Sequence, residues 1–280
     1  MGLYQNNNAS QLAILTDGIY NNIDFTVNTL DNQTSLLNTL SGLNLTYFKR
    51  APSQLFDQDA RSLNQRVAKN VSNSNKDFVT ITYQVIAPPH SQLYVSIPNI
   101  SWSDDNNHTL SITVNGVTKN QVTDNTFDFF DLGYFETESM VTIKLSFPGN
   151  KAISFDNPSF YALDTQNYQI AMNTINERDS KVTTSKNKVF VDYSSKTNAS
   201  LFFTIPYDKG WTATINHKKV KIQRAQKGFM KVDVPSGKGK VVLTFIPYGL
   251  KTGSLISLLA SIIFCCYAYF IRKTTIIQKS

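Results

Sequence analysis

The chain has 280 residues, of which 41% are apolar and 17% are charged. This composition excludes an intrinsically disordered chain, and it excludes a membrane protein with spans along its whole length. Lysine and arginine (27) exceed aspartate and glutamate (20), which gives a formal net charge of +7, and the excess is concentrated after Lys181. Most of the chain is therefore expected to fold in water around a sizeable core.

The amino-terminal part, residues 1–75, is predicted to contain one short helix and a linker. Between residues 23 and 42, Asp31-Asn32 offers capping side chains, leucines follow at helical spacing, and Gly42 provides a stop. Residues 55–75 are polar and have only weak helical periodicity, so we expect a linker or a loosely docked helix there.

Residues 76–164 alternate apolar and polar side chains with a period of two, which indicates half-buried strands. The Asn115-Gly116 pair is a hairpin signal, because both central residues of a type I′ turn need a positive φ. Strand-like runs recur roughly every ten residues without intervening helices, which is typical of an antiparallel β-sandwich or jelly roll. The alternating residues are Val79, Ile81, Tyr83 and Val85; Leu93, Val95 and Ile97; Leu110, Ile112 and Val114; and Val141, Ile143, Leu145 and Phe147.

A second β region is predicted over residues 165–248, and it opens with a helix over residues 166–177. The alternation then resumes in short runs separated by turn sequences such as Asp208-Lys209-Gly210 and Pro235-Ser236-Gly237. The predicted fold class is therefore mainly β: two consecutive antiparallel β-sandwich or jelly-roll-like regions, a short N-terminal helix and one C-terminal transmembrane helix. The periodicity is compatible with two separate cores or with one shared core.

Residues 249–272 contain the most apolar stretch of the chain. Residues 254–271 carry no charge, and at 1.5 Å per residue they span about 27 Å, close to the hydrocarbon thickness of a bilayer. We therefore predict a transmembrane helix, with a buried core helix as the alternative. Arg272 and the basic tail, residues 273–280, place the C-terminus in the cytoplasm by the positive-inside rule, and the bulk of the chain outside it.

Export of the bulk of the chain requires a signal that the amino end does not show. Residues 1–8 have neither a basic n-region nor an apolar h-region, and Asn6 breaks the myristoylation pattern. We expect the tail of a longer membrane protein whose earlier helices perform the translocation, with a tail-anchored protein facing the cytoplasm as the alternative. The two cysteines, Cys265 and Cys266, lie in the apolar stretch, so the folded part is expected to lack disulfides, as in the cytosol or on the outer face of a bacterium.

Basic residues recur every few positions between Lys181 and Lys251, interleaved with apolar residues of strand type. A surface that faces anionic lipid head groups or an anionic wall polymer accounts for this pattern. Nucleic-acid binding is the alternative, but no nucleic-acid motif accompanies the charges, and we expect no nucleic-acid partner. The candidate contacts for an anionic polymer or lipid are Lys218, Lys219 and Lys221.

Motifs for metal binding, cofactor binding or catalysis are not found in the sequence, so no metal, cofactor or catalytic residue is predicted. His90, His108 and His217 lack the spacing of a zinc site. The run Asp104–Asn107 presents oxygen ligands for Ca²⁺, but it lacks the spacing of an EF-hand, and a solvated turn is favoured.

Four carboxylates lie close together in the sequence, and a glycosidase needs a pair of such acids. They are Asp128, Asp131, Glu136 and Glu138. Sequence proximity does not supply the separation of about 5 to 9 Å across a groove that such a pair needs, and solvent-facing strand charges are favoured.

Aromatic side chains are the best candidates for a ligand surface. Sugars stack their apolar faces on exposed rings while neighbouring side chains bind the hydroxyl groups, and core packing is the alternative for each ring. The candidate glycan-binding residues are Trp102, Tyr134, Tyr207, Asp208 and Trp211, with Phe135 as a further aromatic residue.

The run Leu201–Trp211, which ends in I-P-Y-D-K-G-W, strongly resembles the carboxyl end of YfhO-like bacterial membrane proteins, as does Ile246–Leu250 before the apolar stretch. Weaker similarity extends to Asp31–Gly42 and Phe160–Asp164, so the resemblance covers most of the chain. One departure is His217, where the family usually has glycine.

The resemblance implies a multi-spanning GT-C-type glycosyltransferase that transfers sugar from a lipid-linked donor to a cell-envelope polymer, such as lipoteichoic acid in Gram-positive bacteria. It also implies a catalytic acid in an early extracytoplasmic loop, which no residue of this chain matches. The chain is then expected to be the accessory extracytoplasmic module and last anchor of that enzyme in the bacterial cell membrane. Its expected partners are the lipid bilayer, the amino-terminal transmembrane region of the same protein and the anionic glycopolymer.

Two other functions are compatible with the sequence. One is a non-enzymatic, membrane-anchored carbohydrate-binding or adhesion module. The other is a structural spacer, which predicts that Trp102 and Trp211 are both buried.

Overall fold

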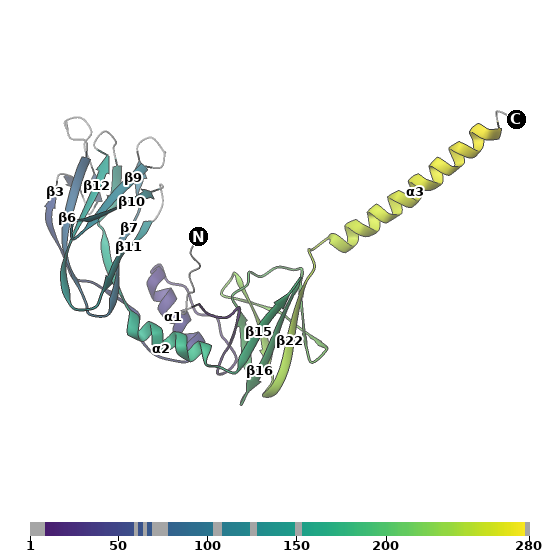
Figure 1. The fold of residues 1–280 in the computed structure, drawn as a ribbon, viewed down its shortest axis with the longest axis horizontal. Coiled ribbons are helices and arrows are strands. Elements are labelled where there is room, and N and C mark those ends of the chain that lie inside the picture. The colour runs from purple at the N-terminus through teal and green to yellow at the C-terminus, as the bar shows by residue number, and fades with distance from the viewer. Residues whose placement is uncertain are drawn as a thin grey trace. The chain divides into compact units, whose positions relative to one another are not determined.

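Strands dominate the fold, as the two-residue periodicity predicts (Figure 1). A computed structural model describes residues 9–58, 61–63, 66–68, 78–102, 108–123, 128–148 and 153–277. Within these residues the strands pair in antiparallel sheets and three helices are present, which confirms the mainly β fold class with its C-terminal apolar helix. The chain divides into two compact units. The first β unit is Asp24–Asn38 with Leu43–Asn173, and the second β unit is the described part of Met1–Ile23, Thr39–Gly42 and Thr174–Ser280.

The first β unit is built around two main sheets that share one core. Their strand orders are β10-β9-β12-β6-β3 and β11-β7-β14-β2, and a smaller sheet has the order β4-β5-β13-β8. The strands are β2 (Phe48–Arg50), β3 (Ser53–Gln58), β4 (Arg61–Leu63), β5 (Arg66–Ala68), β6 (Phe78–Ala87), β7 (Ser91–Ile97), β8 (Ser101–Trp102), β9 (His108–Val114), β10 (Val117–Thr123), β11 (Asp128–Phe135), β12 (Ser139–Pro148), β13 (Ile153–Asp156) and β14 (Ser159–Asp164).

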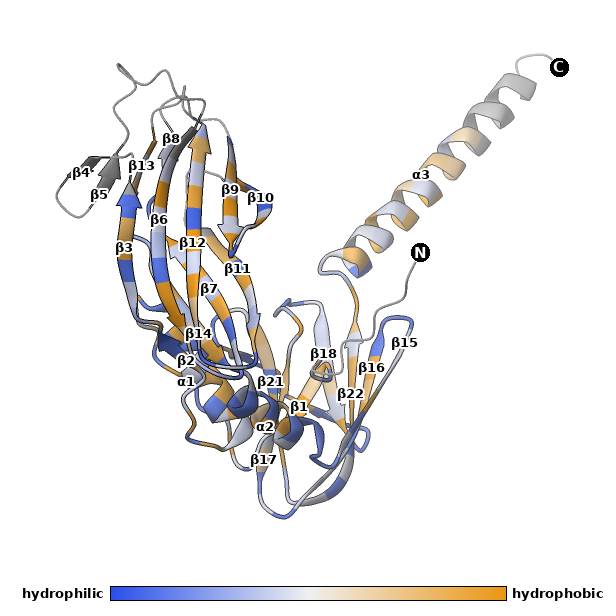
Figure 2. Cartoon of the chain, turned by 60° about the vertical axis from the view of Figure 1, so that its left-hand side comes forward, coloured by the Kyte–Doolittle hydropathy of each residue, from blue (hydrophilic) through white to orange (hydrophobic). Residues whose placement is uncertain are grey.

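Alternation of side chains decides which face of each strand is buried. Val85 on β6, Val95 on β7 and Ile143 on β12 are all fully buried in the shared core. Figure 2 shows the alternation as blue and orange segments along β6 and β12. The predicted hairpin joins β9 to β10, where Asn115 and Gly116 have φ values of 46° and 89°.

Helix α1 (Thr29–Ser41) begins earlier than the predicted cap at Asp31-Asn32. The Asn28 side-chain oxygen accepts a hydrogen bond from the Leu30 amide at 3.0 Å, so Asn28 satisfies an amide group that would otherwise lack a partner. Gly42, with a φ of 73°, follows the last residue of the helix, as predicted.

Residues 53–58 differ from their expected place in a linker or loosely docked helix, because they form strand β3. β3 pairs antiparallel with β6, and Leu55 lies opposite Tyr83. Only the partner strand reveals this assignment, since an edge strand with mainly polar residues carries no strong periodicity of its own.

The second β unit takes one strand from the amino-terminal segment. Strand β1 (Ala13–Leu15) pairs with β17, which gives the sheet order β1-β17-β21-β20, and the other sheet has the order β15-β16-β22-β18-β19. Side chains of both sheets form one core, separate from that of the first β unit. The remaining strands are β15 (Ser180–Ser185), β16 (Lys188–Ser195), β17 (Ala199–Phe203), β18 (Trp211–Ile215), β19 (Lys218–Val220), β20 (Gln223–Ala225), β21 (Phe229–Val234) and β22 (Gly237–Phe245).

A buried polar network holds the amino-terminal segment against β17 and β21. The Lys231 ammonium donates to the Tyr20 carbonyl at 2.8 Å and to Asp233 at 3.1 Å, while the Ser200 hydroxyl donates to Asp233 at 2.6 Å. Burial by itself would raise the pKa of Asp233, but hydrogen bonds from Ser200, Lys231 and Gln223 and the charge of Lys231 outweigh it, so the pKa is lower than usual.

Arg178 provides a second tie within this unit. Its guanidinium donates to the carbonyls of Leu15 (2.6 Å), Leu40 (2.9 Å) and Ser41 (2.6 Å) and to the Asp17 carboxylate (2.7 Å). One side chain therefore joins β1 to the end of α1.

Helix α2 (Thr165–Asn176) confirms the predicted helix over residues 166–177. Helix α3 (Leu250–Ile277) contains the predicted apolar stretch. Across the described part of the chain, α3 is the one helix long and apolar enough to cross a membrane, over Leu250–Ala268, and none of that window is buried. This exposure is not that of a buried core helix.

Candidate functional site

The loop between β17 and β18 carries the I-P-Y-D-K-G-W sequence and is fixed by local hydrogen bonds. The Asp208 carboxylate accepts from the Gly210 amide at 2.6 Å, and the Trp211 amide donates to the Asp208 carbonyl at 3.2 Å. The Tyr207 amide donates to the Gly228 carbonyl at 2.8 Å, which ties the loop to the turn before β21. The loop therefore presents its side chains in one defined arrangement.

Gly210 packs directly against the chain that leaves β22. A Cβ atom at this position would lie 2.4 Å from the Ile246 carbonyl oxygen and 2.8 Å from the Phe245 ring. The Ile246 amide donates to the Gly210 carbonyl at 3.0 Å. The loop is thus joined to the segment that continues into α3.

Two adjoining surface hollows share Tyr207, Asp208 and Lys209 in their walls. One has a volume of about 210 Å³ and the other of about 310 Å³. Together they form what we call the basic hollow, and its lining residues are Tyr207, Asp208, Lys209, Trp211, Thr212, Ala213, Lys219, Val220, Ile222, Arg224 and Tyr248.

Aromatic rings position the cations of the basic hollow. The Arg224 guanidinium lies over the Tyr207 ring at 4.7 Å, and the Lys209 ammonium lies 5.8 Å from the centre of the Tyr248 ring. Within the described part of the chain, Lys209, Lys219 and Arg224 form no ion pair. The hollow therefore holds three unpaired cations and one carboxylate, Asp208, which favours an anionic ligand.

The basic hollow lies at the start of the apolar helix. Tyr248, which is 81% exposed, lines the hollow and precedes the first residue of α3 by two positions. Chain connectivity therefore keeps these cations close to any membrane that α3 crosses.

The structure gathers three of the predicted glycan-binding residues, Tyr207, Asp208 and Trp211, in the basic hollow. Trp211 is partly buried, with its ring 4.9 Å from that of Phe245. Tyr134 is 49% exposed on β11 and donates a hydrogen bond to Glu136 at 2.7 Å, in the first β unit.

Trp102 is the exception among the predicted glycan-binding residues. It is 1% exposed, and its indole nitrogen donates to the Thr123 hydroxyl at 2.9 Å. Its ring packs in the core of the first β unit and offers no face to a sugar. The structural-spacer alternative predicts that both tryptophans are buried. Trp102 is buried, whereas Trp211 is only partly buried.

The predicted basic contacts divide between the hollow and the open surface. Lys219 lines the hollow, whereas Lys218 and Lys221 are exposed and do not line it. Sequence reasoning did not place Arg224 or Tyr248 in the site. The basic run between Lys181 and Lys251 contains Arg224, and the family-like run Ile246–Leu250 contains Tyr248, but neither pattern shows that Arg224 packs over Tyr207, which depends on how β20 lies beside the loop.

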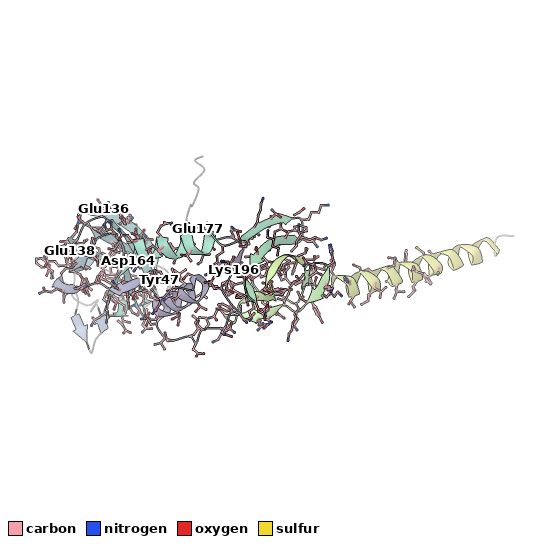
Figure 3. All side chains as sticks on the ribbon, turned by 90° about the horizontal axis from the view of Figure 1, so that it is seen from below. Tyr47, Glu136, Glu138, Asp164, Glu177 and Lys196 are labelled. Carbon is pink, nitrogen blue, oxygen red and sulfur yellow. The ribbon has the colours of Figure 1, made fainter. Side chains whose placement is uncertain are left out.

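Titratable groups elsewhere form no cluster of three or more potential metal ligands within the described ranges. His90 faces Glu136 at 3.2 Å, and the run Asp104–Asn107 lies outside the described residues. Glu136 and Glu138 are exposed (Figure 3), as is Asp131, whose carboxylate accepts from the Gly133 amide at 2.8 Å. The side chain of Asp128 lies outside the described set.

The family model of the bacterial membrane protein YfhO matches residues 1–257. The chain belongs to the YfhO family. A relative from Bacillus subtilis (strain 168), named "Uncharacterized protein YfhO", is 26% identical over 141 residues, which is 48% of this chain and 16% of the relative. The alignment thus spans about a sixth of that YfhO protein. Family membership and α3 together support association with a membrane.

Solved structures add little to the YfhO assignment. A family two carbohydrate esterase from Cellvibrio japonicus matches 42% of this chain and 32% of its own, at 10% identity and a TM-score of 0.28. A cycloisomaltooligosaccharide glucanotransferase from a Paenibacillus species matches 69% of this chain and 44% of its own, at 8% identity and a TM-score of 0.28. Similarities this low support no argument about function.

Proposed function

We propose that this chain is the extracytoplasmic accessory module and membrane anchor of a YfhO-family glycosyltransferase. The enzyme would transfer sugar from a lipid-linked donor to a cell-envelope polymer such as lipoteichoic acid. In this proposal the C-terminus of the chain is cytoplasmic, and the basic hollow contacts phosphate groups outside the membrane. Family membership supports the assignment to a YfhO-family membrane protein, and the basic hollow supports the contact with phosphate groups.

The observation that carries the proposal is that two unpaired cations, Lys209 and Arg224, share a hollow with Tyr248, two residues before α3, while Lys219 lines the adjoining hollow. Arg224 lies over the Tyr207 ring at 4.7 Å, and this packing positions a guanidinium, a group that binds phosphate through paired N–H donors. Lys209 and Lys219 add point charges on the other walls. A polymer or lipid phosphate in the hollow beside Tyr248 would meet Lys209 and Arg224, and a second phosphate in the adjoining hollow would meet Lys209 and Lys219.

A charge-reversal experiment tests the contact with phosphate. The double variant Lys219→Glu with Arg224→Glu changes two walls of the hollow, and Lys188→Glu with Lys186→Glu makes the same change of charge at exposed positions of the second β unit. Binding is measured by co-sedimentation with purified lipoteichoic acid and with phosphatidylglycerol vesicles, so that the two sources of phosphate are separated. We expect the hollow variant to weaken binding to at least one of them by tenfold or more, and the control by threefold or less.

Equal binding by the hollow variant and the control would refute the contact. Binding to vesicles alone would assign the hollow to lipid and would remove the acceptor polymer from the proposal. Glycosylation of the polymer in cells that carry the same variants in the whole protein provides the functional readout.

The size of the native product tests the remaining part of the proposal. An antibody raised against residues 76–245 would detect, in membranes of the source cell, a band several-fold larger than 31.5 kDa if the chain is part of a multi-spanning enzyme. A band at 31.5 kDa would instead favour the alternative function, a membrane-anchored carbohydrate-binding or adhesion module without enzymatic activity.

A further inference from the structure

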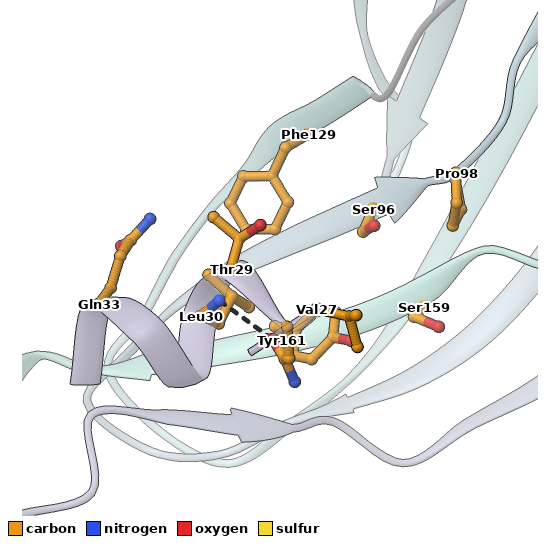
Figure 4. Close-up of a pocket in the computed structure, with 10 residues that line it drawn as sticks. Val27, Thr29, Leu30, Gln33, Ser96, Pro98, Phe129, Ser159 and Tyr161 are labelled. Atoms are coloured by element: carbon orange, nitrogen blue, oxygen red, sulfur yellow. Dashed lines mark hydrogen bonds between the residues drawn. The ribbon is translucent and has the colours of Figure 1, made fainter. Parts of the chain in front are cut away.

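A second hollow lies wholly within the first β unit, between the first turns of α1 and the outer face of the sheet β11-β7-β14-β2. Its volume is about 490 Å³, within the usual range of sites for small organic ligands. Figure 4 shows its lining side chains, which come from α1 and its preceding turn and from β7, β11 and β14. We call it the α1 groove.

Aromatic rings form the sheet side of the α1 groove. Alternation turns Val95, Phe130 and Phe160 into the core, so the ring of Phe129 on β11 and that of Tyr161 on β14 face outward and remain partly exposed. Their ring centres are 6.5 Å apart. The Phe129 ring is also stacked on Tyr94, with the ring centres 4.9 Å apart, and it is tilted by 44° to the ring of Tyr161. The two rings thus provide an angled apolar wall that the fold leaves partly uncovered.

Polar groups without partners surround this wall. The hydroxyls of Thr29, Ser96 and Tyr161 and the side-chain amide of Gln33 make no hydrogen bond within the described part of the chain. Ser96 is only 4% exposed, so its hydroxyl has little access to bulk water. The other three groups belong to exposed or partly exposed side chains, so a ligand that supplies hydrogen-bonding partners at this place would replace water bound to them.

Charge separates the α1 groove from the basic hollow. None of the side chains that line the groove is ionised at neutral pH. One cation lies beside the groove: Arg50, opposite Tyr161 on β2, donates to the Ser159 hydroxyl at 2.6 Å. The lining itself offers an anion no cation, and a purely apolar peptide would leave the hydroxyls and the amide unpaired. Flat apolar faces combined with many uncharged hydroxyl groups are the chemistry of a neutral sugar.

We propose that the α1 groove binds a short neutral saccharide. A sugar ring stacks on Tyr161 and packs against the exposed part of the Phe129 ring, and its hydroxyl groups bond with Ser96, Thr29 and Gln33. The proposal is independent of the proposed function, because it concerns the other β unit and an uncharged ligand. It also places the sugar on residues different from those predicted from the sequence, among which Tyr134 lies on the same strand as Phe129 but does not line the groove.

The test uses the full chain in nanodiscs, since maltoside detergents would themselves compete for the groove. The probes are neutral oligosaccharides of two to six glucose, galactose or N-acetylglucosamine units, screened by saturation-transfer NMR and measured by calorimetry. Tyr161→Ala removes one ring, and Thr29→Trp fills the groove from an exposed helical position where folding is little affected. Tyr134→Ala removes an exposed ring of the same sheet outside the groove and is the matched control.

We expect at least one neutral oligosaccharide to bind, with the Kd raised tenfold or more by Tyr161→Ala and by Thr29→Trp and changed less than threefold by Tyr134→Ala. Circular dichroism confirms that each variant folds, and if Tyr161→Ala does not, Thr29→Trp decides alone. The proposal is overturned if no neutral oligosaccharide binds at 10 mM, if only anionic sugars bind, or if both groove variants bind as the unaltered chain does.

Discussion

Replacing Gly210 with alanine should destabilise the second β unit, because the new methyl group has no room. The Cβ would lie 2.4 Å from the Ile246 carbonyl oxygen, whereas ordinary van der Waals contact begins at 3.4 Å, so the two segments must separate by about 3.4 − 2.4 = 1.0 Å. The Ile246 amide donates to the Gly210 carbonyl at 3.0 Å, and such a movement would stretch or break that bond.

The expected cost has two parts. Overpacking against a fixed backbone costs about 1–3 kcal/mol, and loss of the hydrogen bond adds about 0.5–1.5 kcal/mol. We therefore expect Gly210→Ala to lower the free energy of unfolding of the second β unit by about 2–4 kcal/mol. At about 4–8 °C per kcal/mol for a unit of this size, the Tm of the second β unit would fall by roughly 10–30 °C.

Gly228→Ala is the matched control for this prediction. Gly228 lies in the turn that accepts a hydrogen bond from Tyr207, but a Cβ there would come no closer than 3.9 Å to the Gln226 carbonyl. This variant should unfold within about 2 °C of the unaltered chain, because the new methyl group makes only ordinary contacts.

The assay is thermal unfolding of the full chain in nanodiscs, followed by fluorescence with acrylamide quenching. Trp211 is partly exposed and reports on the second β unit, whereas Trp102 is buried in the first β unit and reports on that unit. The Trp211 transition should shift in Gly210→Ala and the Trp102 transition should not. Equal Trp211 transitions in Gly210→Ala and Gly228→Ala would refute the steric argument.

Three further predictions concern the two polar ties and the predicted hairpin. Because the pKa of Asp233 is lowered in the folded state, the unfolded chain binds more protons than the folded chain as pH falls. The stabilisation from Asp233 is therefore complete above about pH 5 and is lost as pH falls below the ordinary value of 3.8. Urea titrations at several pH values should find that the free energy of unfolding depends less on pH in Asp233→Asn. Arg178→Lys should lower the free energy of unfolding, measured by chemical denaturation, by about 2–3 kcal/mol, since an ammonium cannot reach the same set of carbonyls. Asp17→Asn, which changes a carboxylate that is 73% exposed, should lower it by less than about 1 kcal/mol. Gly116→Val should lower the urea midpoint of the first β unit, because a β-branched residue is strained at a φ of 89°; an unchanged midpoint would contradict the turn assignment.

Local pattern predicted the strands well where one face of a strand is buried and the other is solvated. Side chains of β6, β7, β9 and β12 alternate in the sequence because successive residues point to opposite faces, and the same residues form the core. The Asn115-Gly116 hairpin was equally predictable, since few residue pairs adopt two successive positive φ values. β3 was not predictable, because an edge strand is defined by its partner.

Site residues were less predictable than strands. Periodicity shows that an aromatic residue alternates with apolar ones, but not whether another element covers it. Trp102 is enclosed by the core, whereas Phe129 and Tyr161 stay partly open beside α1. The sequence did carry a signal: Phe129 and Tyr161 each lie next to an aromatic residue that points into the core, so they must point outward on their strands.

By itself, the sequence determined the mainly β class, the apolar helix at the carboxyl end, the excess of positive charge and the family, because composition, periodicity and motifs are local properties of the chain. The tertiary structure alone decided that β1 joins a sheet near the other end of the chain. It also decided that Arg224 lies over Tyr207 beside Lys209, and that α1 forms one wall of a groove lined by uncharged side chains. These features depend on contacts between residues far apart in the sequence, and the free energy of such contacts is set only when the sheets pack.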